Sequence, residues 1–435
     1  MKPLLRLLFL VILLYILYNL AAELSFNAEE ATALDVEESR KAKIRVRQPL
    51  EDKKLSNDSP KKTFEPVRVP IVFENKKQVL IYSATKFFKM DVTTERFLGN
   101  CFSTMGFCRI SENPADYEKA DAVLFHSADY RQGNVPKNRR PGVPHVLWSL
   151  ESQANDRFRP EPGLFAQYLK RWLLDVINWT MTPLKHSDIW YPYGHCEERP
   201  EAIVLDLDEI WKMKTEKTAV WLASNCFTVN RRKDIINSLV SFGVDFKFMD
   251  PKFDPRRGPI KACIFPRSAD LFGACGRPAP DCAGVHMQGY DCVKTLVRKY
   301  KFYFSIENSN CKDYVTEKFW AALGERYAVP IILERKKYEA VGAPPNSFIA
   351  IDDFKNLKEV AEHIKKVAAD KGEYLKYHKW RNTHQVFPEH DDATGFCELC
   401  RVLQTPPYKK NSYHDIAKFQ SPQEQCNQDY ANRFF

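Results

Sequence analysis

Short apolar runs alternate with helical patterns along most of the chain. The runs at 79–82, 122–126 and 146–150 have no helical period, which is typical of strands buried on both faces. Farther along, strand-like runs alternate with amphipathic helices, the strands at 219–223, 301–306, 329–333 and 348–351 and the helices at 231–240, 313–323 and 357–368. This alternation predicts an α/β fold with mostly parallel sheets.

The chain begins with a segment that is apolar enough to cross a membrane. Residues 3–22 contain a single charge, Arg6, and about 20 apolar residues span a bilayer as a helix. Because Lys2 and Arg6 lie on the short side, we predict a cytoplasmic tail at 1–6, a transmembrane signal-anchor at 7–24 and a luminal remainder. A cleaved signal peptide is the alternative, and it also sends the remainder into the secretory pathway.

The next residues, 25–75, have the composition of a stem. No aromatic residue occurs between 27 and 63, and the charge in this stretch changes from acidic to basic. We interpret the stretch as a solvated tether, and contact between its basic half and an anionic surface is the alternative. Nucleic acid is not an expected partner in the lumen.

A break in the pattern divides the rest of the chain. The strand pattern stops around Pro192-Tyr193-Gly194, and an acidic stretch follows as far as Glu209. We therefore predict one domain at 76–200, a second at 201–390 and a C-terminal segment at 391–435.

Composition excludes several classes of protein. The 435 residues are 44% hydrophobic and 13% aromatic, which excludes a disordered or collagen-like chain. With 65 basic against 56 acidic side chains, the net charge is +9. The chain lacks G-x-G-x-x-G, G-x-x-x-x-G-K-[ST], H-E-x-x-H and G-x-S-x-G, so the commonest nucleotide-binding, zinc-protease and serine-hydrolase signatures are absent.

Twelve cysteines in an oxidising compartment predict disulfides, although sequence alone leaves their pairing open. Cys397 and Cys400 form a C-x-x-C, which we interpret as disulfide-forming. The alternatives are a zinc site with His384 and His390, which lie just upstream, and a redox motif. Asn178 and Asn57 begin N-glycosylation sequons.

Polar residues directly after apolar strands mark candidate chemistry, because ligands of open α/β sheets bind at the carboxyl ends of the strands. Glu151 follows the run 146–150, where a carboxylate is placed to act as a general base toward a hydroxyl. A second cluster occupies 303–309 and leads into the helix predicted at 313–323. The start of that helix offers free N–H groups and a favourable dipole to a diphosphate, and Lys318 adds a positive charge.

Other side chains of this second cluster suit a sugar nucleotide. Glu307 and Glu317 have carboxylates for ribose or sugar hydroxyls, and Tyr314 has a phenol to position the ligand. The alternatives are structural: a solvated helix face for Glu317 and Lys318, core packing for Tyr314, and a turn cap for Asn308.

Two further features are weaker signals. Arg232 opens a helix after Ser224-Asn225-Cys226, where a guanidinium can bind phosphate with two hydrogen bonds. Asp206 and Asp208 form a D-x-D, which holds a divalent ion in another class of glycosyltransferase. Because this pair lies in the acidic stretch, we interpret it as a solvated connector and predict no metal site.

The stretch 302–323 resembles the α-1,3-fucosyltransferases, whose signature runs approximately F-Y-L-x-F-E-N-S-x-x-x-D-Y-V-T-E-K. Four further blocks agree in order with that family: Leu150-Glu151-Ser152, Asn178-Trp179-Thr180, 188–194 and Ser224-Asn225-Cys226. The resemblance covers about 79–400.

The resemblance implies two Rossmann-like domains facing a cleft (GT-B type) in a Golgi type II membrane enzyme. The N-terminal domain would mainly receive the acceptor, and the C-terminal domain would hold GDP-fucose. It also implies an inverting displacement, with Glu151 as the base and with Arg232 and Lys318 steadying the diphosphate. The implied donor contacts are Asn308, Tyr314 and Glu317, with Glu307 beside them. No obligatory cofactor is expected, and stimulation by Mn²⁺ or Mg²⁺ is left open.

The chain departs from the family pattern at three places. Pro183-Leu184-Lys185 stands where many members have Y-R-R, Gln153 replaces a proline, and 250–292 is longer than the usual link. We predict transfer of fucose in α-1,3 linkage to a GlcNAc of an N-glycan or related glycan. The alternatives are an inactive glycan-binding protein of the same fold and a Golgi transferase with another donor.

Overall fold

The computed structural model describes residues 77–156, 175–245, 270–272, 291–388, 394–406 and 411–435, except positions 105, 137, 217, 224, 226 and 227. The predicted anchor and stem, Asn57 and most of 250–292 lie outside the described residues. All described residues belong to one compact unit. Within these ranges, no helix is both long and apolar enough to span a bilayer.

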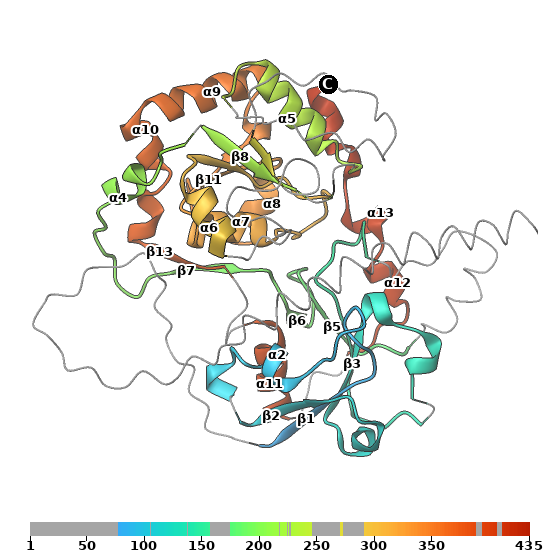
Figure 1. Ribbon diagram of the computed structural model, residues 1–435. Helices are drawn as coiled ribbons and strands as arrows, with labels where there is room; N and C mark the ends of the chain where they lie inside the picture. Colours follow the sequence, from blue (N-terminus) through green and yellow to red (C-terminus); the bar gives the residue numbers. More distant parts are fainter. Residues whose placement is uncertain are drawn as a thin grey trace, which may run out of the picture. The chain divides into compact units, whose positions relative to one another are not determined.

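The first sheet is parallel and has six strands in the order β2-β1-β3-β4-β5-β6 (Figure 1). Its strands are β1 Val79–Ser83, β2 Cys108–Ser111, β3 Ala122–His126, β4 His145–Trp148, β5 Trp179–Thr182 and β6 Ile189–Trp190. Every residue of β3 and β4 is buried, as the unbroken apolar runs predict. The strand expected at 146–150 ends at Trp148, and the chain bends at Glu151.

The second sheet is also parallel, with five strands in the order β12-β11-β10-β8-β9. Its strands are β8 Ala219–Leu222, β9 Asp270–Phe272, β10 Phe302–Phe304, β11 Val329–Ile332 and β12 Ile349–Ala350. The sequence order reverses between β8 and β10, and such a switch point is where open α/β sheets bind ligands. Each of the four predicted strands of this region is confirmed, in a shorter form.

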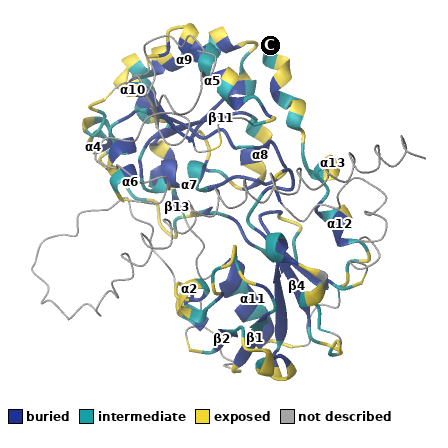
Figure 2. Ribbon diagram, turned by 45° about the vertical axis from the view of Figure 1, so that its right-hand side comes forward, coloured by how far each residue is buried: buried dark blue, intermediate teal, exposed yellow. Residues whose placement is uncertain are grey.

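Helices cover both faces of the second sheet. On one face α5 (Arg232–Ser241) and α9 (Leu357–Ala369) pack side by side on Trp221 and Phe302. On the other face α6 (Asp291–Arg298) and α7 (Glu317–Gly324) cover Val220 and Tyr303. Figure 2 shows the buried strands between helices whose outer sides are exposed. The predicted α/β class is therefore confirmed.

The predicted helix 313–323 begins later than expected, at Glu317. Asp313 has a φ of 54°, in the left-handed region, so it cannot start a right-handed helix. Thr316 caps α7 instead, and its side chain accepts a hydrogen bond from the Lys318 N–H. The predicted helices 231–240 and 357–368 match α5 and α9 to within one residue at each end.

The remaining helices and strands are mostly short. They are the α-helices α2 Thr94–Phe97, α4 Asp208–Lys212, α8 Arg335–Ala340, α10 Lys371–Lys376, α11 Gly395–Gln404, α12 Ile416–Phe419 and α13 Pro422–Gln425, and the 3₁₀ helices Phe102–Thr104, Pro114–Lys119, Ser127–Asp129, Gln132–Asn134, Ile351–Asp353, Lys379–Asn382 and Gln428–Phe434. A small antiparallel sheet pairs β7 (His195–Glu198) with β13 (His384–Phe387).

Gly194, at the start of this antiparallel pair, is required by close packing. A Cβ at this position would lie 2.6 Å from the Trp320 Cγ and 2.7 Å from the Phe387 carbonyl oxygen. Only glycine lets the chain pass between α7 and β13 at this point.

The chain after residue 394 returns to the first sheet. Phe396, Leu399 and Leu403 of α11 are buried in the core on one face, and Ile416 of α12 is buried on the other. Burial of each such side chain contributes roughly 1.5–3 kcal/mol. The predicted C-terminal segment, 391–435, thus covers both faces of a sheet whose strands lie between residues 79 and 190.

Disulfides hold this returning segment. Cys397 pairs with Cys101 and Cys400 pairs with Cys108, so both cysteines of the C-x-x-C form disulfides, as predicted, but not with each other. Cys426 pairs with Cys311, next to the predicted donor motif. Beyond Cys426, the 3₁₀ helix Gln428–Phe434 buries Ala431 in the core of the second sheet.

The sequon residue Asn178 is part of the packing of the first sheet. Its Oδ1 accepts a hydrogen bond from the His145 N–H at 3.0 Å, and its Nδ2 donates to the Asn411 carbonyl at 3.2 Å. Nδ2 is the atom that a glycan would modify, and after modification it would keep one N–H. Glycosylation of Asn178 stays a prediction.

Candidate active site

Glu151 lies just beyond the carboxyl end of β4, where the sequence predicts a base. The Glu151 N–H donates to the Ser149 Oγ at 3.1 Å, and the Ser152 N–H donates to the Glu151 Oε1 at 2.8 Å. The Leu150 carbonyl accepts a hydrogen bond from the Tyr193 Oη at 2.6 Å. These bonds hold the turn, so the half-buried carboxylate has a defined position.

Tyr314 joins the predicted donor motif to Glu151. Its Oη donates to the Glu151 Oε1 at 2.9 Å, which links residues 163 positions apart in the sequence. Burial raises the pKa of Tyr314 well above its usual value, and the neighbouring Tyr193 and Glu151 raise it further. The phenol therefore stays protonated and acts as a hydrogen-bond donor at neutral pH.

Glu307 is buried behind the N-terminus of α7, with only 2% of its surface exposed. Its Oε1 accepts the Thr316 N–H at 2.8 Å, and its Oε2 accepts the Thr316 hydroxyl at 2.8 Å. The Lys318 Nζ lies 3.4 Å from Oε2. A buried carboxylate needs such partners, so in this structure Glu307 positions the start of α7. Direct contact between Glu307 and a donor stays a prediction.

Lys318 and Glu317 form a charged pair at the same helix start. The Lys318 Nζ donates to the Glu317 Oε1 at 2.9 Å. Burial opposes charge on Lys318, but the carboxylates of Glu317 and Glu307 outweigh it and raise its pKa. Burial likewise opposes charge on Glu317, and Lys318 outweighs it and lowers the carboxyl pKa. The two side chains are therefore both charged at neutral pH. The Lys318 ammonium lies at the start of α7, where the N–H groups of Lys318 and Phe319 already donate to Thr316.

Arg232 is almost fully buried, with 1% of its surface exposed. Its guanidinium donates to the Ile306 carbonyl at 3.0 Å and to the Asn225 carbonyl at 2.6 Å. These bonds tie the loops that follow β8 and β10, at the switch point of the sheet. Its Nε has no acceptor among the described residues. Arg232 thus shapes the predicted diphosphate site, and its direct contact with phosphate stays a prediction.

Asn308 is partly exposed beside Glu307, and its Oδ1 accepts a hydrogen bond from the Ser309 hydroxyl at 3.2 Å. The predicted catalytic and donor-binding residues therefore lie at two places. Glu151 and Tyr314 meet directly, while the others lie around the ends of β8 and β10 and the start of α7: Asn308, Glu307, Glu317, Lys318 and Arg232.

Three residues were missed by the sequence reasoning. Tyr193 packs its ring edge-to-face on Tyr314, with centroids 6.1 Å apart. Asn230 is buried and donates through Nδ2 to the Glu307 carbonyl at 2.8 Å. The Asp313 Oδ2 accepts the Lys185 N–H at 2.9 Å. The signals for Tyr193 and Asp313 were present, because both lie in blocks that match the family pattern.

The departures from the family pattern have structural roles. Leu184 is fully buried, and the loop around it is held by the Asp313 carboxylate. Gln153 is buried as well.

At the D-x-D, the Asp208 carboxylate pairs with Lys371 of α10 at 2.7 Å, and Asp206 accepts the Asp208 N–H at 3.0 Å. These contacts agree with a solvated connector.

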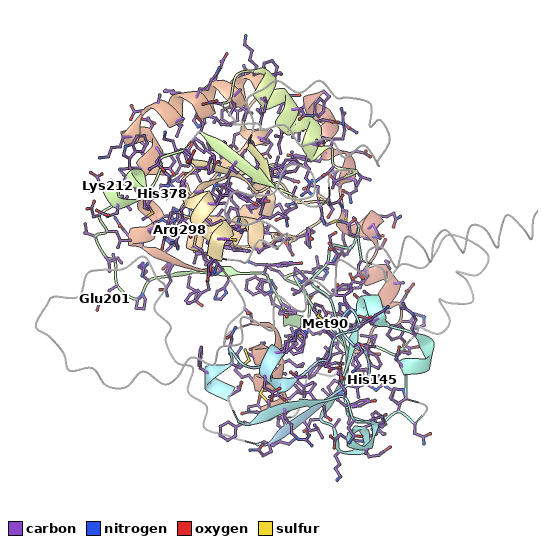
Figure 3. The ribbon with its side chains drawn as sticks, viewed as in Figure 1. Met90, His145, Glu201, Lys212, Arg298 and His378 are labelled. Atoms are coloured by element: carbon purple, nitrogen blue, oxygen red, sulfur yellow. A yellow bond between two sulfur atoms is a disulfide. The ribbon has the colours of Figure 1, made fainter. Side chains whose placement is uncertain are left out.

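Two buried histidines belong to the core and not to the site. Figure 3 shows His145 among the strands of the first sheet and His378 beside α10. Burial and the charge of Arg139 lower the pKa of His145 to about 4. Burial and the charge of Arg381 lower the pKa of His378 well below its usual value. Both rings are therefore neutral at neutral pH.

Replacing Thr316 with valine is expected to lower the free energy of unfolding by about 1–3 kcal/mol. The change removes the cap of α7 and the hydroxyl that donates to the buried Glu307 carboxylate. Urea unfolding of the purified full-length protein measures the effect. Thr405→Val is the control, because Thr405 is exposed and its hydroxyl donates to the Val402 carbonyl at 3.4 Å. Equal losses in the two variants would contradict the role of Thr316.

Comparison with known proteins decides the family. The profile described as "Fucosyltransferase, N-terminal" matches residues 74–194, and "Glycosyltransferase family 10 (fucosyltransferase) C-term" matches residues 266–419. Alpha-(1,3)-fucosyltransferase fut-6 of Caenorhabditis elegans is 43% identical over 367 residues, which cover 82% of this chain and 84% of the worm protein. The chain belongs to glycosyltransferase family 10, the fucosyltransferases.

Other members of the family are similar to this glycosyltransferase. Alpha-(1,3)-fucosyltransferase fut-5 of Caenorhabditis elegans is 32% identical over 377 residues, covering 84% of this chain and 88% of that protein. A crystal structure of an alpha1,3-fucosyltransferase with GDP-fucose is 13% identical, with a TM-score of 0.45, and the match covers 80% of this chain and 97% of that one. In this family 10 enzyme, Glu151 lies in the N-terminal match and Tyr314 and Lys318 lie in the C-terminal match. The resemblance inferred from the motif at 302–323 is confirmed.

Proposed function

We propose that this family 10 enzyme transfers fucose from GDP-fucose, in α-1,3 linkage and with inversion, to a GlcNAc hydroxyl of a glycan. The observation that carries the proposal is the hydrogen bond from the Tyr314 Oη to the Glu151 Oε1, because it joins the donor motif to a carboxylate base. In a one-step displacement, the base that deprotonates the acceptor hydroxyl must lie close to the bound donor.

In the proposed reaction, Glu151 takes the proton of the acceptor hydroxyl. Among the described residues, the donors to this carboxylate, Tyr314 and Ser152, both bond to Oε1. Oε2 is therefore available to the acceptor. As the proton moves to Oε2, the hydroxyl oxygen bonds to the anomeric carbon, and the bond from that carbon to the diphosphate oxygen breaks on the opposite face. The products are the fucosylated glycan and GDP.

The leaving GDP gains negative charge, so cations and N–H donors should face it. Lys318 stays charged at the start of α7, where the helix dipole also favours an anion. We assign Lys318 and the nearby guanidinium of Arg232 to the diphosphate. Asn308, Tyr314, Glu317 and Glu307 are the proposed donor contacts. No obligatory metal is proposed, and stimulation by Mn²⁺ or Mg²⁺ is a question for the assay.

A pocket on the first sheet suits the acceptor. It has a volume of about 510 Å³ and lies at the carboxyl ends of β1 and β3, the edge of the sheet that also carries Glu151. Its lining includes basic side chains, such as Lys86 and Arg131, and acidic ones, Glu112 and Asp129. Mixed donors and acceptors match the hydroxyl groups of a saccharide better than a single charge does.

The proposed location is the Golgi membrane, with a single type II anchor at 7–24 and a luminal catalytic part. Three disulfides between described residues support this proposal, because disulfides persist in oxidising compartments.

The proposal is tested by GDP release from GDP-fucose with the purified full-length protein. An N-glycan core and a LacNAc glycan are offered separately, each with and without EDTA. Release with one acceptor, and analysis of the linkage in the product, would support the proposal and name the acceptor class. GDP binding without release, for both acceptors, would favour an inactive glycan-binding protein instead.

A further inference from the structure

Residues 425–428, which we call the strap, cross the predicted donor motif just before Tyr314. Cys426 of the strap and Cys311 of the motif form an antiparallel bridge and a disulfide. Two backbone hydrogen bonds flank the bridge: the Lys312 N–H donates to the Gln425 carbonyl at 2.7 Å, and the Asn427 N–H donates to the Asn310 carbonyl at 2.8 Å. The strap is thus fixed to the motif by its backbone as well as by a covalent bond.

The chain on either side of the strap is anchored in the two sheets. Before the strap, Ile416 of α12 is buried in the core of the first sheet. After it, Ala431 is buried in the core of the second sheet, and the Tyr430 Oη donates to the Asp352 Oδ2 at 2.8 Å. The position of the strap is therefore set by both cores.

The disulfide of the strap packs with Tyr314. Cys311 and Tyr314 are buried in one apolar cluster with Ala154, and Cys426 packs against this cluster. Ala154 follows Glu151 by three residues. The cluster therefore joins the strap, the Tyr314 ring and the turn that carries the proposed base.

Asp313, the residue before Tyr314, needs this support. Its φ of 54° lies in the left-handed region, and a residue other than glycine keeps such a conformation only where surrounding contacts fix it. The strap fixes the backbone at 310–312, and the Lys185 N–H donates to the Asp313 Oδ2 at 2.9 Å. Because Tyr314 follows directly, its hydrogen bond to Glu151 depends on these contacts.

Gln428 adds a side-chain bond to the motif, because its Oε1 accepts the Asn310 N–H at 3.3 Å. We propose that the strap positions Tyr314 against Glu151, so that Cys426 and Gln428 are positioning residues for the transfer reaction. Both act through Tyr314. The inference rests on the proposed function for the reaction, whereas the contacts of the strap are defined by its own residues.

Removal of the disulfide tests the proposal. In the full-length protein, Cys311→Ser with Cys426→Ser is expected to lower the turnover number about 10–10²-fold, because misplaced reacting groups are costly. The Kd for GDP should change by about twofold or less, since contacts outside the strap hold Lys318 and Arg232. GDP release and calorimetry measure the two quantities.

Cys108→Ser with Cys400→Ser is the matched control, because it removes a disulfide from the core of the first sheet, at the edge strand β2. The folded control should keep both the turnover number and the Kd for GDP. An equal loss of turnover in the control would overturn the proposal. A loss of GDP affinity as large as the loss of turnover in the first variant would also overturn it.

Gln428→Ala keeps the disulfide, so it tests the strap even where the serine variant does not fold. Loss of the acceptor for the Asn310 N–H is expected to lower turnover about three- to tenfold. Gln428→Glu should restore turnover, because a carboxylate oxygen accepts the same bond. Gln423→Ala, at an exposed position of α13, is the control. Unchanged turnover in Gln428→Ala, or an equal loss in Gln423→Ala, would contradict the role of Gln428.

A measurement without transfer separates this inference from the proposed function. In protein labelled with 3-fluorotyrosine, Tyr314→Phe identifies the ¹⁹F resonance of Tyr314 among the 19 tyrosines. This line should broaden or split in both strap variants, because the phenol loses its single position, and stay sharp in both controls. A sharp line in the strap variants would overturn the proposal. A broadened line in a protein that transfers no fucose would support the strap and contradict the proposed function.

Discussion

Replacing Glu151 with glutamine is expected to lower the rate of fucosyl transfer by about 10²–10⁴-fold and to leave GDP affinity nearly unchanged. Glutamine keeps the size of the side chain, and its carbonyl oxygen can still accept the hydrogen bonds from Tyr314 and Ser152. It cannot take the proton of the acceptor hydroxyl. The turnover number from GDP release and the Kd for GDP from calorimetry measure the two effects separately.

Glu362→Gln is the control for this experiment, because Glu362 is an exposed carboxylate of α9 outside the site. It should change neither quantity. A loss of GDP affinity in Glu151→Gln as large as its loss of turnover would show that Glu151 belongs to the donor site and not to proton transfer.

Replacing Lys318 with alanine is expected to raise the Kd for GDP about tenfold or more and to lower turnover at the same time. The ammonium group is the charge that faces the leaving diphosphate in the proposed reaction. The same change should also lower the free energy of unfolding by about 3–5 kcal/mol, because the buried Glu307 carboxylate loses its cation. Calorimetry with GDP and urea unfolding measure the two losses.

A second substitution separates binding from stability. In the double variant Lys318→Ala with Glu307→Gln, position 307 no longer carries a buried charge without a cation, so part of the lost stability should return, although Glu317 still lacks its partner. GDP affinity should stay low, because the cation is still missing. Recovery of GDP affinity along with stability would mean that Lys318 acts only by holding the fold, and it would contradict its assignment to the diphosphate.

The sequence predicted those site residues whose position depends on a local pattern of strands and helices. Glu151 comes directly after a buried strand, and the carboxyl ends of parallel strands are where such sheets bind ligands. The sequence also predicted a helix that contains Lys318, but it placed the start of that helix at Asp313 and not at Glu317. It did not show that Glu307 lies behind Thr316 with 2% exposure, because burial of a carboxylate depends on partners from other elements. Nor did it show that Arg232 donates to two backbone carbonyls.

The sequence by itself determined the α/β class, the strands at 122–126 and 329–333, and the amphipathic helix at 357–368, since local apolar periodicity sets which faces are buried. It also favoured disulfides over a zinc site at Cys397 and Cys400, and the structure confirms the disulfides. Only the tertiary structure decided their partners, Cys101 and Cys108, which lie 296 and 292 residues away. The tertiary structure also decided the hydrogen bond from Tyr314 to Glu151. Such contacts depend on how distant elements pack, and no local pattern records that packing.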